Sequence, residues 1–255
     1  MPALREWRSY VPSSIDEGTK LPKPSRDEDE ITMSYETLSR LSLLRDSTYV
    51  FVCDSSKDLD FSVVLDLLSV ENPSVVTFRS VSEGLYYSLK NTPSVLTVVS
   101  SKPPAGVVSI VFNDKGRVQI TKYELRKEFL GFLKTEIVDE KALSELVAEA
   151  SVTTATKILS RFIKYRGVKD GHVSLVNGFI RNPRLLERVL SSLKLKKADS
   201  SIVEELRKQG YEVNLGTAVA LTKIAERCSN NERIVYVGGT ISEGVIILHM
   251  KCAGV

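Results

Sequence analysis

The chain has 255 residues, of which 42% are hydrophobic and 26% are charged. These values are ordinary for a globular protein of one or two domains, and they exclude a chain that is disordered throughout. No apolar run approaches the roughly 20 residues of a membrane-spanning helix, and the first ten residues lack the apolar core of a signal peptide. The 35 basic and 32 acidic residues nearly balance, so the net charge of +3 does not indicate a nucleic-acid partner.

The cysteine content indicates an intracellular protein. Three cysteines, Cys53, Cys228 and Cys252, are too few for a disulfide framework, and no two of them form a CxxC pair. We therefore expect reduced thiols and a cytoplasmic protein without membrane attachment. Cys53 and Cys228 are predicted to be small buried apolar residues.

The first half of the chain predicts alternating helices and strands after an irregular start. Residues 1–30 hold four of the nine prolines and end in the charged run RDEDE, which predicts an extended arm or loop, with a disordered tail as the alternative. The alternation that follows is typical of a largely parallel sheet with crossover helices. The predicted elements are a helix from residue 31, a strand at 47–56, a helix at 60–69, a strand at 73–80, a helix at 82–91 and a strand at 93–101.

The second half repeats this alternation after a predicted hairpin. Two β-rich runs over 106–123 flank Asn113-Asp114-Lys115-Gly116, which predicts a β-hairpin. The remaining predicted elements are helices at 123–134 and 138–165, a strand at 172–179, helices at 183–195, 200–210 and 216–228, and a closing hairpin of 232–239 and 243–250 around Gly239-Thr240. The order of elements recurs between the halves, which predicts a duplicated α/β unit, with chance recurrence as the alternative.

Six segments in chain order carry a resemblance to one known family. They are RDEDEITMSYETLSRL (26–41), FRSVSEGLYYSL (78–89), AGVVSIVFNDKGRVQITKYE (105–124), SLVNGFIRNPRLLERVLSSLKL (174–195), EVNLGTAVALTKIAER (212–227) and RIVYVGGTISEGVIILHM (233–250). Together they resemble the thiolase superfamily, most closely a shortened, degenerate archaeal 3-hydroxy-3-methylglutaryl-CoA synthase or ketoacyl synthase. The resemblance implies duplicated α/β units in a layered αβαβα arrangement. It divides the chain into an arm (1–30), an N-terminal half (31–135) and a C-terminal half (136–255).

The same resemblance implies that the catalytic groups are degenerate. Enzymes of this superfamily use a cysteine thiolate at a helix start, a histidine and an asparagine or second histidine, and Ser82 stands where the cysteine would be. The position of the histidine falls on Phe179 when counted from the following helix, or on Asn177 when counted from the strand, and neither residue is a base. Asn214 matches the asparagine. The resemblance therefore implies the fold and argues against the activity.

Three functions follow as expectations. The first is a catalytically silent thiolase-like protein, a structural or regulatory subunit that forms a homodimer or a heteromer with an active enzyme of the superfamily. The second is an enzyme with altered chemistry, which holds a coenzyme A thioester and acts through Ser82, Glu83 or Asn214. The third sets the resemblance aside in favour of a Rossmann-like module for a nucleotide or a protein, although no GxGxxG motif supports the nucleotide version.

Each candidate residue also has a structural interpretation. Ser82 is expected to be the N-cap of helix 82–91, Asn177 to lie in a turn with Gly178 rather than an oxyanion site, and Asn214 to bond nearby backbone. Two further pairs of residues have two interpretations each, contact with a ligand such as coenzyme A or a structural role. These are Gly238 and Gly239, as close backbone approach or tight hairpin turn, and Lys164 and Arg166, as phosphate contacts or a solvated helix face.

Overall fold

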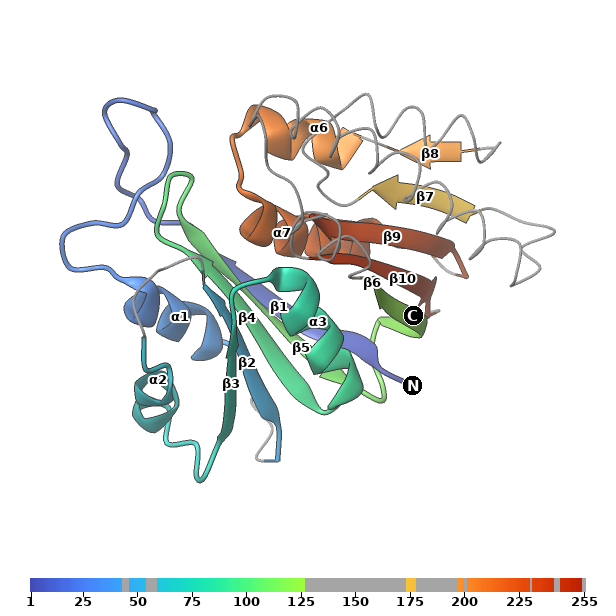
Figure 1. Cartoon of the computed structure of the whole chain (residues 1–255), viewed down its shortest axis with the longest axis horizontal. Coiled ribbons are helices and arrows are strands. Elements are labelled where there is room, and N and C mark those ends of the chain that lie inside the picture. Colours follow the sequence, from blue (N-terminus) through green and yellow to red (C-terminus); the bar gives the residue numbers. More distant parts are fainter. Residues whose placement is uncertain are drawn as a thin grey trace, which may run out of the picture.

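The computed structural model describes most of the N-terminal half of the chain and separate stretches of the C-terminal half (Figure 1). The described residues are 1–42, 46–53, 59–126, 173–177, 197–199, 201–229, 231–240 and 244–253. The strands are β1 (Ala3–Tyr10), β2 (Thr48–Cys53), β3 (Ser74–Phe78), β4 (Ser94–Ser100), β5 (Gly106–Asn113), β6 (Val118–Arg126), β7 (Val173–Asn177), β8 (Lys197–Asp199), β9 (Arg233–Thr240) and β10 (Gly244–Cys252). The helices are α1 (Glu30–Leu38), α2 (Ser62–Leu67), α3 (Val81–Lys90), α6 (Ser201–Lys208) and α7 (Val213–Arg227).

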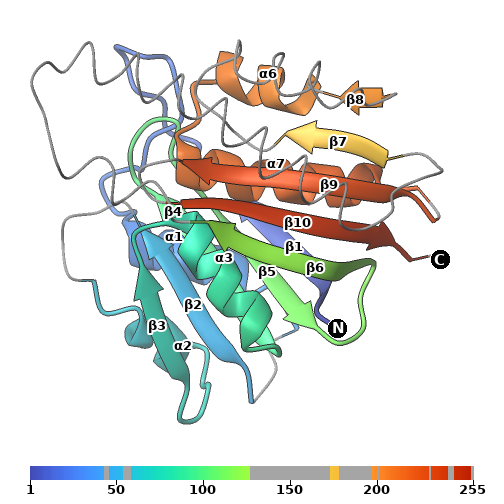
Figure 2. The ribbon, with the colours of Figure 1, turned by 45° about the vertical axis from the view of Figure 1, so that its right-hand side comes forward.

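The ten strands form one sheet whose order is mirrored about its centre. The order is β3-β2-β4-β5-β1-β6-β10-β9-β7-β8, so β1 to β5 on one side correspond to β6 to β10 on the other. Strand directions match as well, because β2 is parallel to β3 and β4, β7 is parallel to β8 and β9, and the remaining pairs are antiparallel. The two halves join where β1 pairs with β6, and Figure 2 shows β10 beside β6 in the second half. The predicted duplication is confirmed, whereas the boundary at 135/136 lies outside the described residues and stays a prediction.

Helices cover both faces of the N-terminal half of the sheet. Along β2, Tyr49 and Phe51 face one hydrophobic cluster with α1 and α2, whereas Val50 and Val52 face a second cluster with α3 and α7. This alternation follows from the two-residue period of a strand. Helix α1 begins at a capping box between Asp29 and Thr32. The acidic run therefore lies at the N-terminus of the helix, where negative charge is favourable to the helix dipole. The layers place α3 and α7 in contact inside the fold.

The predicted hairpin at 106–123 is wrong, because β1 lies between β5 and β6. Strand β1 pairs along its length with β5 and, at Ala3 and Leu4, with β6. The link between β5 and β6 crosses the start of β1, and a Cβ on Gly116 would lie 2.3 Å from the carbonyl oxygen of Leu4. Glycine therefore permits a close crossing here rather than a turn between paired strands.

Two further expectations fail in the same region. Residues 3–10 form a central strand, although 1–30 were expected to be irregular, because ALREWRSY lacks the apolar alternation that marks a strand. Residues 123–126 belong to β6 rather than to the start of a helix. The rest of the predicted helices at 123–134 and 138–165, and the whole of 183–195, lie outside the described residues.

The cysteine prediction is correct only for Cys53, which is buried and is not part of a disulfide. Cys228, directly after α7, and Cys252, the last residue of β10, form a disulfide with a Cα–Cα distance of 5.7 Å. The expectation of reduced thiols at these two positions is wrong. The two cysteines are 24 residues apart in the sequence, which does not reveal that the end of α7 and the end of β10 meet. Within the described ranges, no helix has the length and apolarity needed to cross a membrane.

The Tyr10–Glu28 hydrogen bond ties residues 25–28 to β1 and predicts a pH dependence. The Tyr10 hydroxyl donates to Glu28, which also accepts from the Ser25 amide at 2.8 Å. The bond to Glu28, with burial and the negative charge, raises the pKa of Tyr10 from 10.0 to about 12, and the same bond lowers the pKa of Glu28. The Tyr10 contribution to stability is therefore complete below pH 10 and lost towards about pH 12. The Glu28 contribution is present above its unfolded pKa of 4.5 and lost as the pH falls through its lowered value.

An alkaline absorbance titration checks this prediction. The difference between wild type and Tyr10→Phe should contain one phenol with a midpoint at about pH 12. In a Glu28→Gln variant that midpoint should move back towards 10.0. A Tyr10 midpoint that is the same with and without Glu28 would contradict the assigned cause.

Candidate functional site

The start of α3 and the start of α7 meet, as the family resemblance implies for Ser82 and Asn214. Ser80, with extended backbone, is the N-cap of α3, and its side chain makes no capping bond. The expectation that Ser82 is the N-cap is therefore wrong. The Val81 amide donates to Oδ1 of Asn214 at 2.9 Å, across 133 positions of the sequence. Nδ2 of Asn214 donates to the carbonyl oxygen of Arg79 at 2.8 Å.

Asn214 thus caps α3 from another element. The side-chain oxygen accepts from the Val81 amide, which has no partner within the helix, and the side-chain nitrogen donates to the Arg79 carbonyl in the turn before the helix. Asn214 is only 5% exposed. The interpretation as an asparagine that bonds backbone is correct, but the backbone belongs to a distant turn rather than to its own loop. In this arrangement the amide holds the two halves together.

Ser82, the second residue of α3, is enclosed by the fold. It is 0% exposed, and its Oγ has no hydrogen-bond partner among the described residues. Gly239 lies directly against it, since a Cβ on Gly239 would be 1.9 Å from the Oγ of Ser82. A serine hydroxyl needs a positioned base to become a nucleophile, and no base hydrogen-bonds to Ser82 within the described stretches.

Gly238 and Gly239 are strand residues rather than a hairpin turn. They pair with Ile246 and Val245 of β10, so the interpretation as a tight turn is wrong. Gly239 has a φ of +95°. A Cβ on Gly238 would lie 2.8 Å from the Tyr236 ring and 2.9 Å from the Thr217 side chain.

The buried side chains around the glycine pair leave no room at these backbones for a ligand. Tyr236 is fully buried, which raises the pKa of its phenol, and its hydroxyl donates to the carbonyl oxygen of Thr217 at 2.8 Å. Gly238 and Gly239 are themselves buried. The two glycines therefore allow the chain's own side chains, including Ser82, to approach the strand closely.

The other predicted site residues are placed only in part. Asn177 ends β7 in register with Val237, so its backbone lies beside the strand that carries the glycine pair. Phe179, Lys164 and Arg166 lie outside the described residues. Glu83 lies in the first turn of α3 and is partly exposed. No group of three or more potential metal ligands occurs within the part of the chain that is described.

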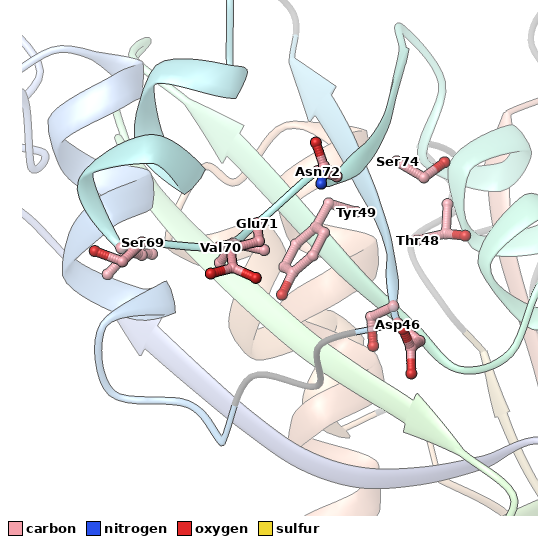
Figure 3. Close-up of a pocket in the computed structure, with 10 residues that line it drawn as sticks. Asp46, Thr48, Tyr49, Ser69, Val70, Glu71, Asn72 and Ser74 are labelled. Atoms are coloured by element: carbon pink, nitrogen blue, oxygen red, sulfur yellow. The ribbon is translucent and has the colours of Figure 1, made fainter.

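A cavity of about 660 Å³ lies at the opposite end of the parallel strands (Figure 3). Thr48 and Ser74, the first residues of β2 and β3, line it, together with Asp46, Tyr49 and the segment 68–72 that follows α2. Ser82, in contrast, follows the carboxyl end of β3. No motif in the sequence indicates this cavity, because its lining comes from strand starts and a short loop.

The comparisons with known proteins match the fold. No protein-family model and no curated protein matches the sequence. Solved structures are similar over nearly the whole of this chain. The 3-oxoacyl-(acyl carrier protein) synthase III of Pseudomonas aeruginosa has a TM-score of 0.72 and 15% identity, over 100% of this chain and 99% of that one.

Two other condensing enzymes give the same result. The synthase III of Aquifex aeolicus has a TM-score of 0.73 and 11% identity, over 98% of this chain and 100% of that one. An HMG-CoA synthase, solved in complex with CoA, has a TM-score of 0.66 and 11% identity, over 99% of this chain and 82% of that one. Such identities establish the fold alone. The Rossmann-like alternative does not describe this architecture. The chain has the thiolase-like α/β fold of these enzymes, which confirms the fold implied by the resemblance of its six segments.

Proposed function

We propose that this chain is a catalytically silent thiolase-like protein that serves as a structural or regulatory subunit beside an active thiolase or synthase. The observation that supports this proposal is that the candidate catalytic residues are engaged in internal contacts of the fold. Both polar ends of the Asn214 amide hold the α3 turn, and Ser82 packs against Gly239 with no hydrogen-bonding base among the described residues. These residues stabilise the contact between the halves, whereas catalysis would need them free to face a substrate.

Coenzyme A is not part of this proposal. One structural neighbour was solved with CoA, but here Ser82, Tyr236 and Thr217 fill the space at Gly238 and Gly239. The pair therefore does not fit a thioester at that point. The alternative function is an acyl-CoA-binding enzyme with altered chemistry, and one observation favours it. The Ser82 hydroxyl is buried at a helix start and has no hydrogen-bond partner in the described stretches.

The edge strand β3 supports the proposed association. Within the described stretches β3 pairs only with β2, which leaves its other edge open. Its five residues, SVVTF, carry no charge. Monomeric proteins usually protect such edges with charged residues or bulges, so an uncharged edge rich in β-branched residues is suited to pairing with a strand of another subunit. The partner is a second copy of this chain or an active enzyme of the same fold.

The test is copurification with matched edge variants. The tagged chain is expected to purify from its native extract as a stable complex with an active condensing enzyme, identified by mass spectrometry and sized by light scattering. Thr77→Lys should weaken this association by about tenfold or more, because a charge would lose water at the strand edge. Val63→Lys, on the exposed face of α2, is the matched control and should leave it unchanged.

A purified chain that is monomeric and carries no condensing enzyme would contradict the proposal. We further propose that the protein is cytoplasmic, which cell fractionation tests directly. The Cys228–Cys252 disulfide is unusual for this location, since reducing compartments usually keep thiols free.

A further inference from the structure

The C-terminal end of α7 is attached to several other elements. The indole N–H of Trp7 in β1 donates to Oε1 of Glu226 at 3.0 Å. The guanidinium of Arg117, just before β6, donates to the carbonyl oxygen of Glu226 at 3.1 Å. Two residues further on, Cys228 is bonded to Cys252 of β10. One turn of helix thus joins β1, the link before β6 and the last strand.

The attachments at the two ends of α7 differ in kind. The N-terminal end is held by the buried Asn214 amide, through bonds to Val81 and Arg79. The polar attachments of the C-terminal end are two hydrogen bonds to the exposed Glu226 and one from Arg227 to Oγ of Ser201 at 3.4 Å, and Ile224 and Ala225 of the same turn are buried in the core. Exposed hydrogen bonds contribute little because water competes for both partners. The disulfide is therefore the strongest attachment of this end beyond the core packing, and the only covalent one among the described residues.

The two cysteines also differ in exposure. Cys252 is 2% exposed, whereas Cys228 is partly exposed at the end of the helix. The Cα–Cα distance of 5.7 Å lies within the range of unforced disulfides, so the bond requires no displacement of either element. Cys228 is therefore the cysteine of the pair that lies nearer to solvent.

We propose that Cys228 and Cys252 form a redox-controlled clip on the C-terminal end of α7. A thiolate of a dithiol reductant attacks Sγ of Cys228, the S–S bond breaks, and Cys252 leaves as a thiolate that takes a proton from water. The second thiol of the reductant then displaces Cys228. Two electrons pass to the protein, which gains two thiols, and the reductant becomes a disulfide. The last turn of α7 then separates from β10 and from Trp7, while the Asn214 end keeps its bonds.

Trp7 is the only tryptophan of the chain and serves as a built-in reporter. Reducing the air-purified protein with dithiothreitol should shift the Trp7 emission to longer wavelength, as the indole loses Glu226 and gains water. Amides in the last turn of α7 should exchange hydrogen about tenfold faster, while those at its start keep their rates. A Cys228→Ser/Cys252→Ser double variant should show the reduced spectrum and no response. Cys53→Ser should respond like wild type.

The reductant titration needs no variant, so the test does not depend on the double variant folding. Circular dichroism and thiol counting show whether the protein is folded and fully reduced. The proposal is overturned by unchanged emission and exchange after full reduction, by global unfolding on reduction, or by free Cys228 and Cys252 in air-purified protein. These outcomes do not bear on the proposed subunit role, because catalysis and partner binding are not measured.

Discussion

A Gly239→Ala variant is expected to lose about 3 to 5 kcal/mol of its free energy of unfolding. The new methyl carbon would lie 1.9 Å from the Oγ of Ser82 and 2.4 Å from the carbonyl oxygen of Gly244. The backbone also has a φ of +95°, which an alanine rarely adopts. Helix α3 and strand β10 would both have to move, and urea denaturation of the two proteins measures the loss.

A matched glycine and a second-site change make this prediction specific. Gly18→Ala places its methyl 3.5 Å from the nearest atom, Oδ2 of Asp16, which is an ordinary contact. It should change stability by no more than about 0.5 kcal/mol. Ser82→Gly in the Gly239→Ala background should recover part of the loss, because it removes the clash with Ser82 but leaves the one with Gly244. Equal effects of the two alanine variants would disprove the close packing of Ser82 on Gly239.

An Asn214→Ala variant is expected to lose about 2 to 4 kcal/mol. Two hydrogen bonds disappear, and the Val81 amide loses its capping partner at the start of α3. Denaturant unfolding measures this loss as well. Asn91→Ala is the matched control, because it removes one amide bond at the other end of α3, to the Tyr87 carbonyl, and should cost about 1 kcal/mol.

Asn214→Asp separates the acceptor from the donor of this amide. A carboxylate still accepts from Val81 but faces the Arg79 carbonyl without a proton, in a site that is 5% exposed. Burial favours the neutral acid, so the folded-state pKa of this aspartate should be raised. Relative to wild type, the variant is therefore expected to be most stable at low pH and to lose stability as the pH rises through that pKa. A difference in stability from wild type that is independent of pH would contradict the donor bond to Arg79.

Local patterns in the sequence predict the elements that local physics determines. The alternation of strands and helices, including β2, α3, β4 and the β9–β10 pair, follows from hydrophobic periodicity and is confirmed. Strand β1 is missed because its apolar and polar residues do not alternate and its pairing partners lie far along the chain. The hairpin at 106–123 fails for the same reason, since nothing between Asn113 and Gly116 reveals a third strand inserted between its neighbours.

The candidate site shows the same limit. The resemblance selects Ser82 and Asn214, and the structure brings their helix starts together. The sequence does not show that Asn214 replaces the capping bond of Ser80, or that Gly239 fits against Ser82, because both are contacts between distant elements. The Cys228–Cys252 disulfide belongs to the same class of non-local contacts.

The most direct test of a silent thiolase-like protein is the intact mass of the purified chain after incubation with acetyl-CoA. A condensing enzyme transfers the acyl group to its nucleophile, so an active site would add one acetyl group to the protein. The enclosed position of Ser82 predicts that wild type and Ser82→Ala keep the mass of the untreated chain. An acetyl adduct on wild type that Ser82→Ala lacks would contradict the silent role and establish Ser82 as a working nucleophile.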